Sequence, residues 1–109
     1  MNITLKKEGD VNVLAIDGRL DTTNYSDLEH HLNSLTEKNE YRILMNLEKM
    51  QYISSSGLRI FLMFLKKIKA ADGRFMLCGM SDDIREIFEI SGFINIFEIH
   101  KTEQEALNA

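Results

Sequence analysis

Three consecutive hydroxyl residues, Ser54 to Ser56, stand between an expected strand and an expected helix. Upstream, residues 41–50 have the mostly apolar pattern of a buried strand and its exit. Downstream, apolar residues recur at helical spacing: Leu58, Phe61, Leu62, Leu65 and Ile68. The serines are therefore expected at a helix N-terminus, where unpaired N–H groups and the helix dipole favour negative charge. A serine in this position is suited to carry a covalently attached phosphate.

Two questions about this region stay open: whether the serines only cap the helix, and how the apolar sides of the helix are covered. The hydroxyl groups also fit an ordinary helix cap followed by a polar loop. The helix carries a second apolar group beside its first, Ile60, Met63 and Phe64, so it is either sandwiched between core elements or offers a partly exposed docking face next to the serines.

Other chemistry finds little support in the sequence. His30 and His31 are adjacent in an expected helix, so their side chains point roughly 100° apart and do not share a metal. Cys78, the single cysteine, lies in an apolar run and is expected in the core. No nucleophile elbow or phosphate-binding glycine loop of the Walker type is present. We expect no enzyme, no metal and no cofactor.

The overall composition predicts one domain over residues 1–109. A net charge of −4 disfavours nucleic-acid binding, which needs a concentrated basic face. The longest apolar run, residues 60–65, is far shorter than the ~20 residues that span a bilayer. With no signal-peptide pattern at the N-terminus, the sequence predicts a cytoplasmic protein without a membrane contact.

The expected element order is β-β-α-β-α-β-α-β-α. Apolar alternation predicts strands around residues 3–5, 11–16, 41–47, 74–78 and within 93–100. Helices are expected from a start between 22 and 26 to about 38, from the serine loop to about 72, from 81 to about 92, and after 102. Strands that alternate with helices indicate an α/β fold, a small mixed sheet with right-handed crossovers flanked by about four helices.

Three segments in this order resemble the STAS domain of bacterial anti-sigma factor antagonists. Gly18-Arg19-Leu20-Asp21 is similar to the family segment that closes the second strand. Residues 43–47 and 50–58 are similar to its central strand and its Asp-Ser-Ser/Ala-Gly-Leu switch. Residues 84–93, ending in Ser-Gly-Phe, resemble its third helix and exit. Together they cover nearly the whole chain and imply a STAS-like fold.

The resemblance implies a role for each matching residue. The family's phosphoacceptor falls on Ser55, with Ser56 and Ser54 as secondary candidates. Asp21 matches an acidic residue near the switch, and Gly57 matches a glycine that permits close packing at the helix start. The family Asp before the acceptor is Ser54 here, which removes a charge. The expected partner-binding residues are Asp21, Ser54, Ser56, Gly57, Leu58, Ile60, Met63 and Phe64.

The implied function is that of a regulator. The unphosphorylated protein would bind an anti-sigma factor that is also a serine kinase of the histidine-kinase-like ATPase type, and so release the sigma factor. Phosphorylation would end the complex and a serine phosphatase would restore it. Alternatives are a phospho-switch module in a secretion or envelope-transport pathway, and a nucleotide-binding STAS domain. The chain is expected as a monomer or weak dimer.

Overall fold

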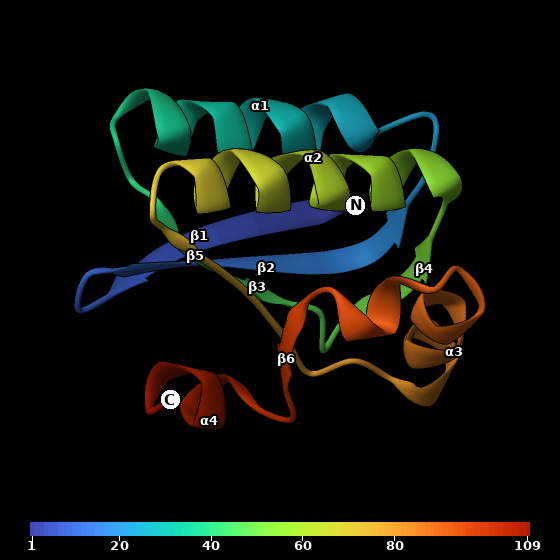
Figure 1. Ribbon diagram of the computed structural model, residues 1–109. Helices are drawn as coiled ribbons and strands as arrows, with labels where there is room; N and C mark the ends of the chain where they lie inside the picture. The colour runs from blue at the N-terminus through green and yellow to red at the C-terminus, as the bar shows by residue number, and fades with distance from the viewer.

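Two long helices lie across one face of a mixed, six-stranded sheet in the computed structural model, which describes residues 1–109 (Figure 1). The strands are β1 (Asn2–Glu8), β2 (Val11–Leu20), β3 (Arg42–Asn46), β4 (Met50–Ile53), β5 (Arg74–Cys78) and β6 (Glu98–His100). The helices are α1 (Tyr25–Glu37), α2 (Ser55–Ala70), α3 (Asp82–Ile90), the 3-10 turn η1 (Phe93–Asn95) and α4 (Glu103–Leu107). The predicted α/β class and its four helices are confirmed.

The sheet has the order β1-β2-β3-β5-β6, with β4 paired to the far end of β2. Only the β1–β2 hairpin is antiparallel, and the other pairs are parallel. Gly9, at a φ of 64°, occupies the two-residue turn of the hairpin, where a left-handed backbone suits glycine. Parallel neighbours require crossover connections, and α1, α2 and α3 supply them, as the alternation of strands and helices predicts.

Alternate residues of the central strands enter two separate cores. Leu14, Ile43 and Leu77 belong to the larger core, together with the buried residues of α1 and α2. Val13, Leu44 and Cys78 face the opposite way and form a smaller core with Ala106 of α4. This two-sided burial explains why the middle strands read as nearly continuous apolar runs. None of the helices is both long and apolar enough to cross a membrane.

Strand β4 is an element that the sequence pattern did not predict. The sequence pattern placed Met50 in the exit of the preceding strand and assigned no element to the three residues after it. In the structure Met50 and Ile53 are buried, while Gln51 between them is exposed, and the strand pairs in parallel with the end of β2. A four-residue strand gives too short a pattern to recognise, and its partner lies 30 residues or so away along the chain.

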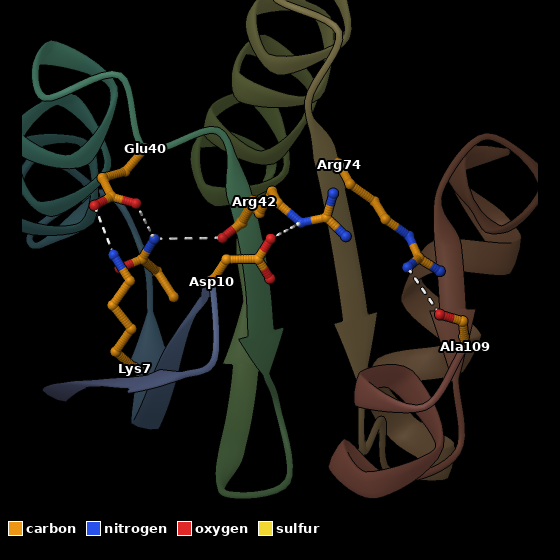
Figure 2. Close-up of polar contacts among 7 residues, drawn as sticks. Lys7, Asp10, Glu40, Arg42, Arg74 and Ala109 are labelled. Atoms are coloured by element: carbon orange, nitrogen blue, oxygen red, sulfur yellow. Dashed lines mark hydrogen bonds and ion pairs between the residues drawn. The ribbon is translucent and has the colours of Figure 1, made fainter.

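Arg74 fixes the C-terminal end of the chain against the sheet. Its guanidinium pairs with both carboxylate oxygens of Glu98 on β6. It also donates to the carbonyl of Ala109 at 3.2 Å (Figure 2). The His100 Nε2 lies 2.7 Å from the same Glu98 carboxylate. Arg74 first, and His100 after it, hold the pKa of Glu98 below its ordinary value of 4.5, although partial burial opposes them.

This carboxylate gives a pH-dependent contribution to stability. Because its pKa is lowered in the folded chain, the contribution is complete above 4.5 and is lost as the pH falls through the lower folded value. We therefore expect Glu98→Gln to destabilise the protein at pH 6, by no more than about 1 kcal/mol since the pair is partly exposed. The difference from wild type should shrink at pH 3, as measured by urea unfolding.

The matched control is Glu86→Gln on α3, whose carboxylate is exposed. A difference between Glu98→Gln and wild type that stays constant from pH 6 to pH 3 would contradict the assigned pairing.

Candidate functional site

The serine loop and the segment after β2 leave the sheet side by side. Leu20 is the register partner of Ile53, and the Ser54 N–H donates to the Leu20 carbonyl at 2.9 Å. Both strands end at these residues and run in the same direction (Figure 1). Asp21 follows Leu20 directly, and Ser55 comes two residues after Ile53. The backbone pairing thus places the segment that carries Asp21 beside the serine loop.

Ser54 is the N-cap of α2. Its backbone is extended, its Oγ accepts from the Gly57 N–H at 3.2 Å, and its carbonyl accepts from the Leu58 N–H at 2.9 Å. These bonds satisfy the third and fourth N–H groups of the helix. The N–H groups of Ser55 and Ser56 have no partner within the chain. They form, with the positive end of the helix dipole, a local environment that is favourable to an anion.

The three serines differ in their exposure to solvent. Ser55 is exposed, whereas Ser54 and Ser56 are half-buried. The Ser54 hydroxyl is engaged in the helix cap, while no hydrogen bond within the chain engages that of Ser55. No acidic residue occupies the first turn of α2, so nothing there would repel added negative charge.

Gly57 lets the helix start close to the sheet. A Cβ at this position would lie 2.9 Å from the Ile53 Cγ1 and from the Cγ and Cδ2 of Leu20. Since real Cβ atoms do not approach neighbours so closely, only glycine fits without displacing these core side chains. The short approach holds the serines in place against the ends of β2 and β4.

Asp21 is half-buried and its carboxylate is held by a local turn. Its Oδ1 accepts from the Thr23 Oγ1 at 2.6 Å and from the Thr23 N–H at 2.9 Å. These hydrogen bonds, and to a smaller degree the charge of Arg19, keep the pKa of Asp21 below its ordinary value of 3.8. The residue is therefore a fixed negative charge beside the serine loop at neutral pH.

The prediction of a docking face is wrong for two of its three residues, Ile60 and Phe64, and leaves only Met63 exposed. Ile60 is 4% exposed and Phe64 is fully buried, because α2 packs with this side against α1 and the sheet. The sandwiched reading of the helix is correct for them. Met63 is 40% exposed, and Leu58 is 7% exposed and part of the core.

The exposed side of α2 instead presents a different row of residues. Ser55, Arg59 and Met63 follow one another at spacings of four, which places them on one side of the helix, and all are exposed. We name this row the α2 outer stripe. It starts at Ser55, the exposed serine of the loop.

Arg19 and Tyr52 also flank the site and were not singled out from the sequence. They are register partners on β2 and β4, and the Arg19 guanidinium lies 4.3 Å from the centre of the Tyr52 ring. The contact stacks a cation on an aromatic face, next to Asp21. Only knowledge of the β2–β4 pairing brings these two residues together.

The STAS-domain sequence model matches residues 2–106. The chain belongs to the STAS-domain family. It is 33% identical to the candidate anti-sigma factor antagonist BtrV of Bordetella bronchiseptica, over all of this chain and 94% of BtrV. Among solved structures, a candidate anti-sigma factor antagonist of Thermotoga maritima has a TM-score of 0.92 at 21% identity, covering 97% of this chain and 92% of the other. Phosphorylated SpoIIAA of Bacillus has a TM-score of 0.76 at 23% identity, covering 98% and 97%.

The cap geometry explains how this STAS domain keeps the helix start at its serine loop without the family Asp. Aspartate and serine are both strong N-cap residues, because each offers a short side-chain oxygen to the N–H groups of the first turn. Ser54 makes this bond with Gly57. The substitution therefore retains the helix start and changes only the charge beside Ser55.

Other reactive side chains of the STAS domain lie apart from this site. Cys78 is buried, and burial raises the pKa of its thiol to about 11, so it is a core residue as expected. No three His, Cys, Asp or Glu side chains are placed together in a way that could hold a metal ion.

Removing the cap should destabilise the domain. Ser54→Ala deletes the acceptor for the Gly57 N–H and is expected to lower the free energy of unfolding by about 1 kcal/mol. Ser54→Asp restores an acceptor and adds a charge that the helix dipole favours, so its stability should equal or exceed that of wild type. Urea unfolding of the three proteins measures both effects, and equal stability of Ser54→Ala and wild type would refute the cap.

Proposed function

We propose that this protein is an anti-sigma factor antagonist that is switched off by phosphorylation of Ser55. The observation that carries the proposal is the exposed, unengaged Ser55 hydroxyl at a helix start whose first N–H groups have no partner. The family membership and the relationship to BtrV support the same class of function. The existence of a phosphorylated SpoIIAA with a similar fold supports a phosphoserine in this architecture.

A phosphate at Ser55 would be tolerated by the domain itself. It adds about 1.5 to 2 negative charges and three strong hydrogen-bond acceptors. The free N–H groups of Ser55 and Ser56 and the dipole of α2 favour these charges, and the first turn holds no acidic side chain. The fixed negative charge of Asp21 lies on the neighbouring segment rather than in the helix start. The fold is therefore expected to change little.

The same phosphate would be costly at an interface. A partner surface that meets a small neutral hydroxyl would instead have to desolvate a dianion, which costs several kcal/mol when no compensating charge is present. A loss of about 1.4 kcal/mol already lowers affinity tenfold. Local charge alone is thus sufficient for the switch, without a conformational change in this chain.

The surface offered to the partner comprises the serine loop and the α2 outer stripe. Met63 supplies an exposed apolar contact and Arg59 a positive charge, both in line with Ser55. Asp21, on the adjacent segment, supplies a negative charge beside them. A complementary partner would place an apolar pocket opposite Met63 and an acidic group opposite Arg59.

The partner proposed for this surface is an anti-sigma factor that also acts as a serine kinase of the histidine-kinase-like ATPase type. Unphosphorylated protein binds it and releases the sigma factor in the cytoplasm, and phosphate transfer from ATP to the Ser55 Oγ ends the complex. A serine phosphatase returns the protein to its binding form. The chain itself takes part as a substrate and binding module rather than as an enzyme.

One substitution and one modification of Ser55 test the switch. We expect Ser55→Ala to retain partner binding and to lose phosphorylation, since only the acceptor oxygen is removed. A chain with phosphoserine incorporated at position 55 should bind the partner at least about a hundredfold more weakly, from about 3 kcal/mol of uncompensated charge. Isothermal titration against the co-purified partner, with phosphate mapping by mass spectrometry, measures both.

The control is Ser56→Ala, which keeps the Ser55 hydroxyl as the phosphoacceptor and removes a neighbouring half-buried hydroxyl. Phosphate on Ser56 or Ser54 in place of Ser55, or full partner affinity of the phosphorylated chain, would contradict the proposal.

Asp21 is expected to act on the partner more than on the fold. In Asp21→Asn the amide oxygen can still accept from the Thr23 N–H, so the turn is retained while the charge is lost. The free energy of unfolding should change by less than about 0.5 kcal/mol, as for other surface substitutions. Partner affinity or the rate of phosphorylation should change severalfold, measured in the same titration and in a kinase assay. A change confined to stability would reduce Asp21 to a turn residue.

A further inference from the structure

Strand β1 is an edge of the sheet, with β2 as its only strand neighbour. Its free edge carries the backbone groups of Ile3, Leu5 and Lys7, and this follows from the hairpin register. Glu8 and Val11 flank a two-residue turn and therefore exchange hydrogen bonds, as do the pairs at every second position, Lys6–Val13 and Thr4–Ala15. The intervening residues of β1 point their N–H and C=O groups away from β2.

The other side of β2 confirms this assignment. The Gly18 N–H donates to the Lys49 carbonyl at 3.0 Å, on the side of β3 and β4. Even-numbered residues of β2 thus bond away from β1, and odd-numbered ones, such as Val13, bond toward it. No loop, cap or turn hydrogen bond reaches the outward groups of Ile3, Leu5 or Lys7.

Proteins usually guard such an edge with charged side chains that repel a second strand. Here the two lysines of β1 are turned back onto their own chain. The Lys7 Nζ lies 2.7 Å from Glu40 (Figure 2), and the Lys6 Nζ lies 2.8 Å from Glu103. Their charges are balanced within the molecule. Leu5, in contrast, is 51% exposed at the centre of the strand.

We propose that β1 pairs with β1 of a second copy of this chain, antiparallel and with the two-fold axis at Leu5. This register joins Ile3 to Lys7 of the other copy, Leu5 to Leu5, and Lys7 to Ile3, three pairs with two backbone hydrogen bonds each. The inference is independent of the proposed function.

The charges along β1 favour this register over its neighbours. It places Lys6 opposite Thr4 and Glu8 opposite Asn2, so no like charges face each other. A shift that centres the pair on Lys6 would set two lysines directly opposite. A shift toward the N-terminus, centred on Thr4, would leave Glu8 outside the paired segment. In this register, the exposed Leu5 side chain of each copy is also covered by Leu5 of the other copy.

The pairing leaves the serine loop accessible. The loop follows β4, which adjoins β2 on the side away from β1. A dimer formed through β1 therefore carries two accessible serine loops. Because a single strand pair makes a small interface, it is expected to associate weakly, and its population depends on protein concentration.

A cysteine at the axis tests the pairing directly in the full-length chain. Leu5→Cys would place two thiols on residues with Cα atoms about 5.5 Å apart, which suits a disulfide. With glutathione disulfide as the acceptor of the two hydrogens, we expect it to form covalent dimers of twice 12.6 kDa. Cys78 does not compete, because it is buried and its thiol pKa is about 11.

Two further cysteine variants make the result specific. Ile90→Cys, an exposed apolar position on α3, controls for random collision and should cross-link far more slowly. Thr4→Cys would cross-link fastest if the axis lay at Thr4 instead. Faster cross-linking of Thr4→Cys, or equal rates for Leu5→Cys and Ile90→Cys, would overturn the proposal.

Sedimentation velocity gives a test without a cross-link. Wild type should shift from monomer toward dimer as its concentration rises to the millimolar range. Leu5→Arg sets two guanidinium groups against each other at the axis and should remain monomeric, while Ile90→Arg should behave as wild type. Circular dichroism confirms the fold of each variant. A wild-type chain that stays monomeric throughout, or an unchanged Leu5→Arg dimer, would refute the pairing.

Discussion

The site depends on one backbone hydrogen bond, from the Ser54 N–H to the Leu20 carbonyl. It is the last bond of the short parallel pair of β2 and β4, and it sets where α2 begins. Gly57 then brings the helix start against Leu20 and Ile53, with no room for a side chain. The position of the Ser55 hydroxyl is thus determined by strand pairing and close packing rather than by a flexible loop.

A rigid site of this kind suits control by charge. The residues beneath the loop, Leu20, Ile53 and Leu58, belong to the larger core, so a movement of the helix start would disturb packing throughout the domain. A phosphate, in contrast, would change the surface by adding charge where two N–H groups are already unpaired. In the proposed switch, the free-energy cost of the modification would therefore fall on the complex rather than on the fold.

The sequence predicts those parts of the fold that local periodicity encodes. Helix α2 and the central strands β3 and β5 follow from apolar spacing, and the helix start follows from its serines. Strand β4 could not be recognised, because its four residues gain their strand character from pairing with the distant end of β2. The contact of Arg19 with Tyr52 was missed for the same reason.

The sequence also could not predict which apolar side of helix α2 is buried within the domain. Ile60 and Phe64 have the spacing of a docking face, and only the position of α1 shows that they are covered. The pattern reports which residues prefer to leave water, not whether the chain itself or a partner covers them. The α2 outer stripe, which mixes Arg59 with Met63, has no apolar pattern and so gave no signal in the sequence.

Strand β2 separates two kinds of surface that this domain offers. Its odd-numbered residues bond to β1, whose outer edge is unpaired, and its even-numbered residues bond toward β3 and β4, beyond which the serine loop lies. The phosphate and a paired edge strand would therefore act on opposite sides of one rigid strand. Since neither contact covers the other, any coupling between self-association and the switch would have to arise in a partner that spans both copies.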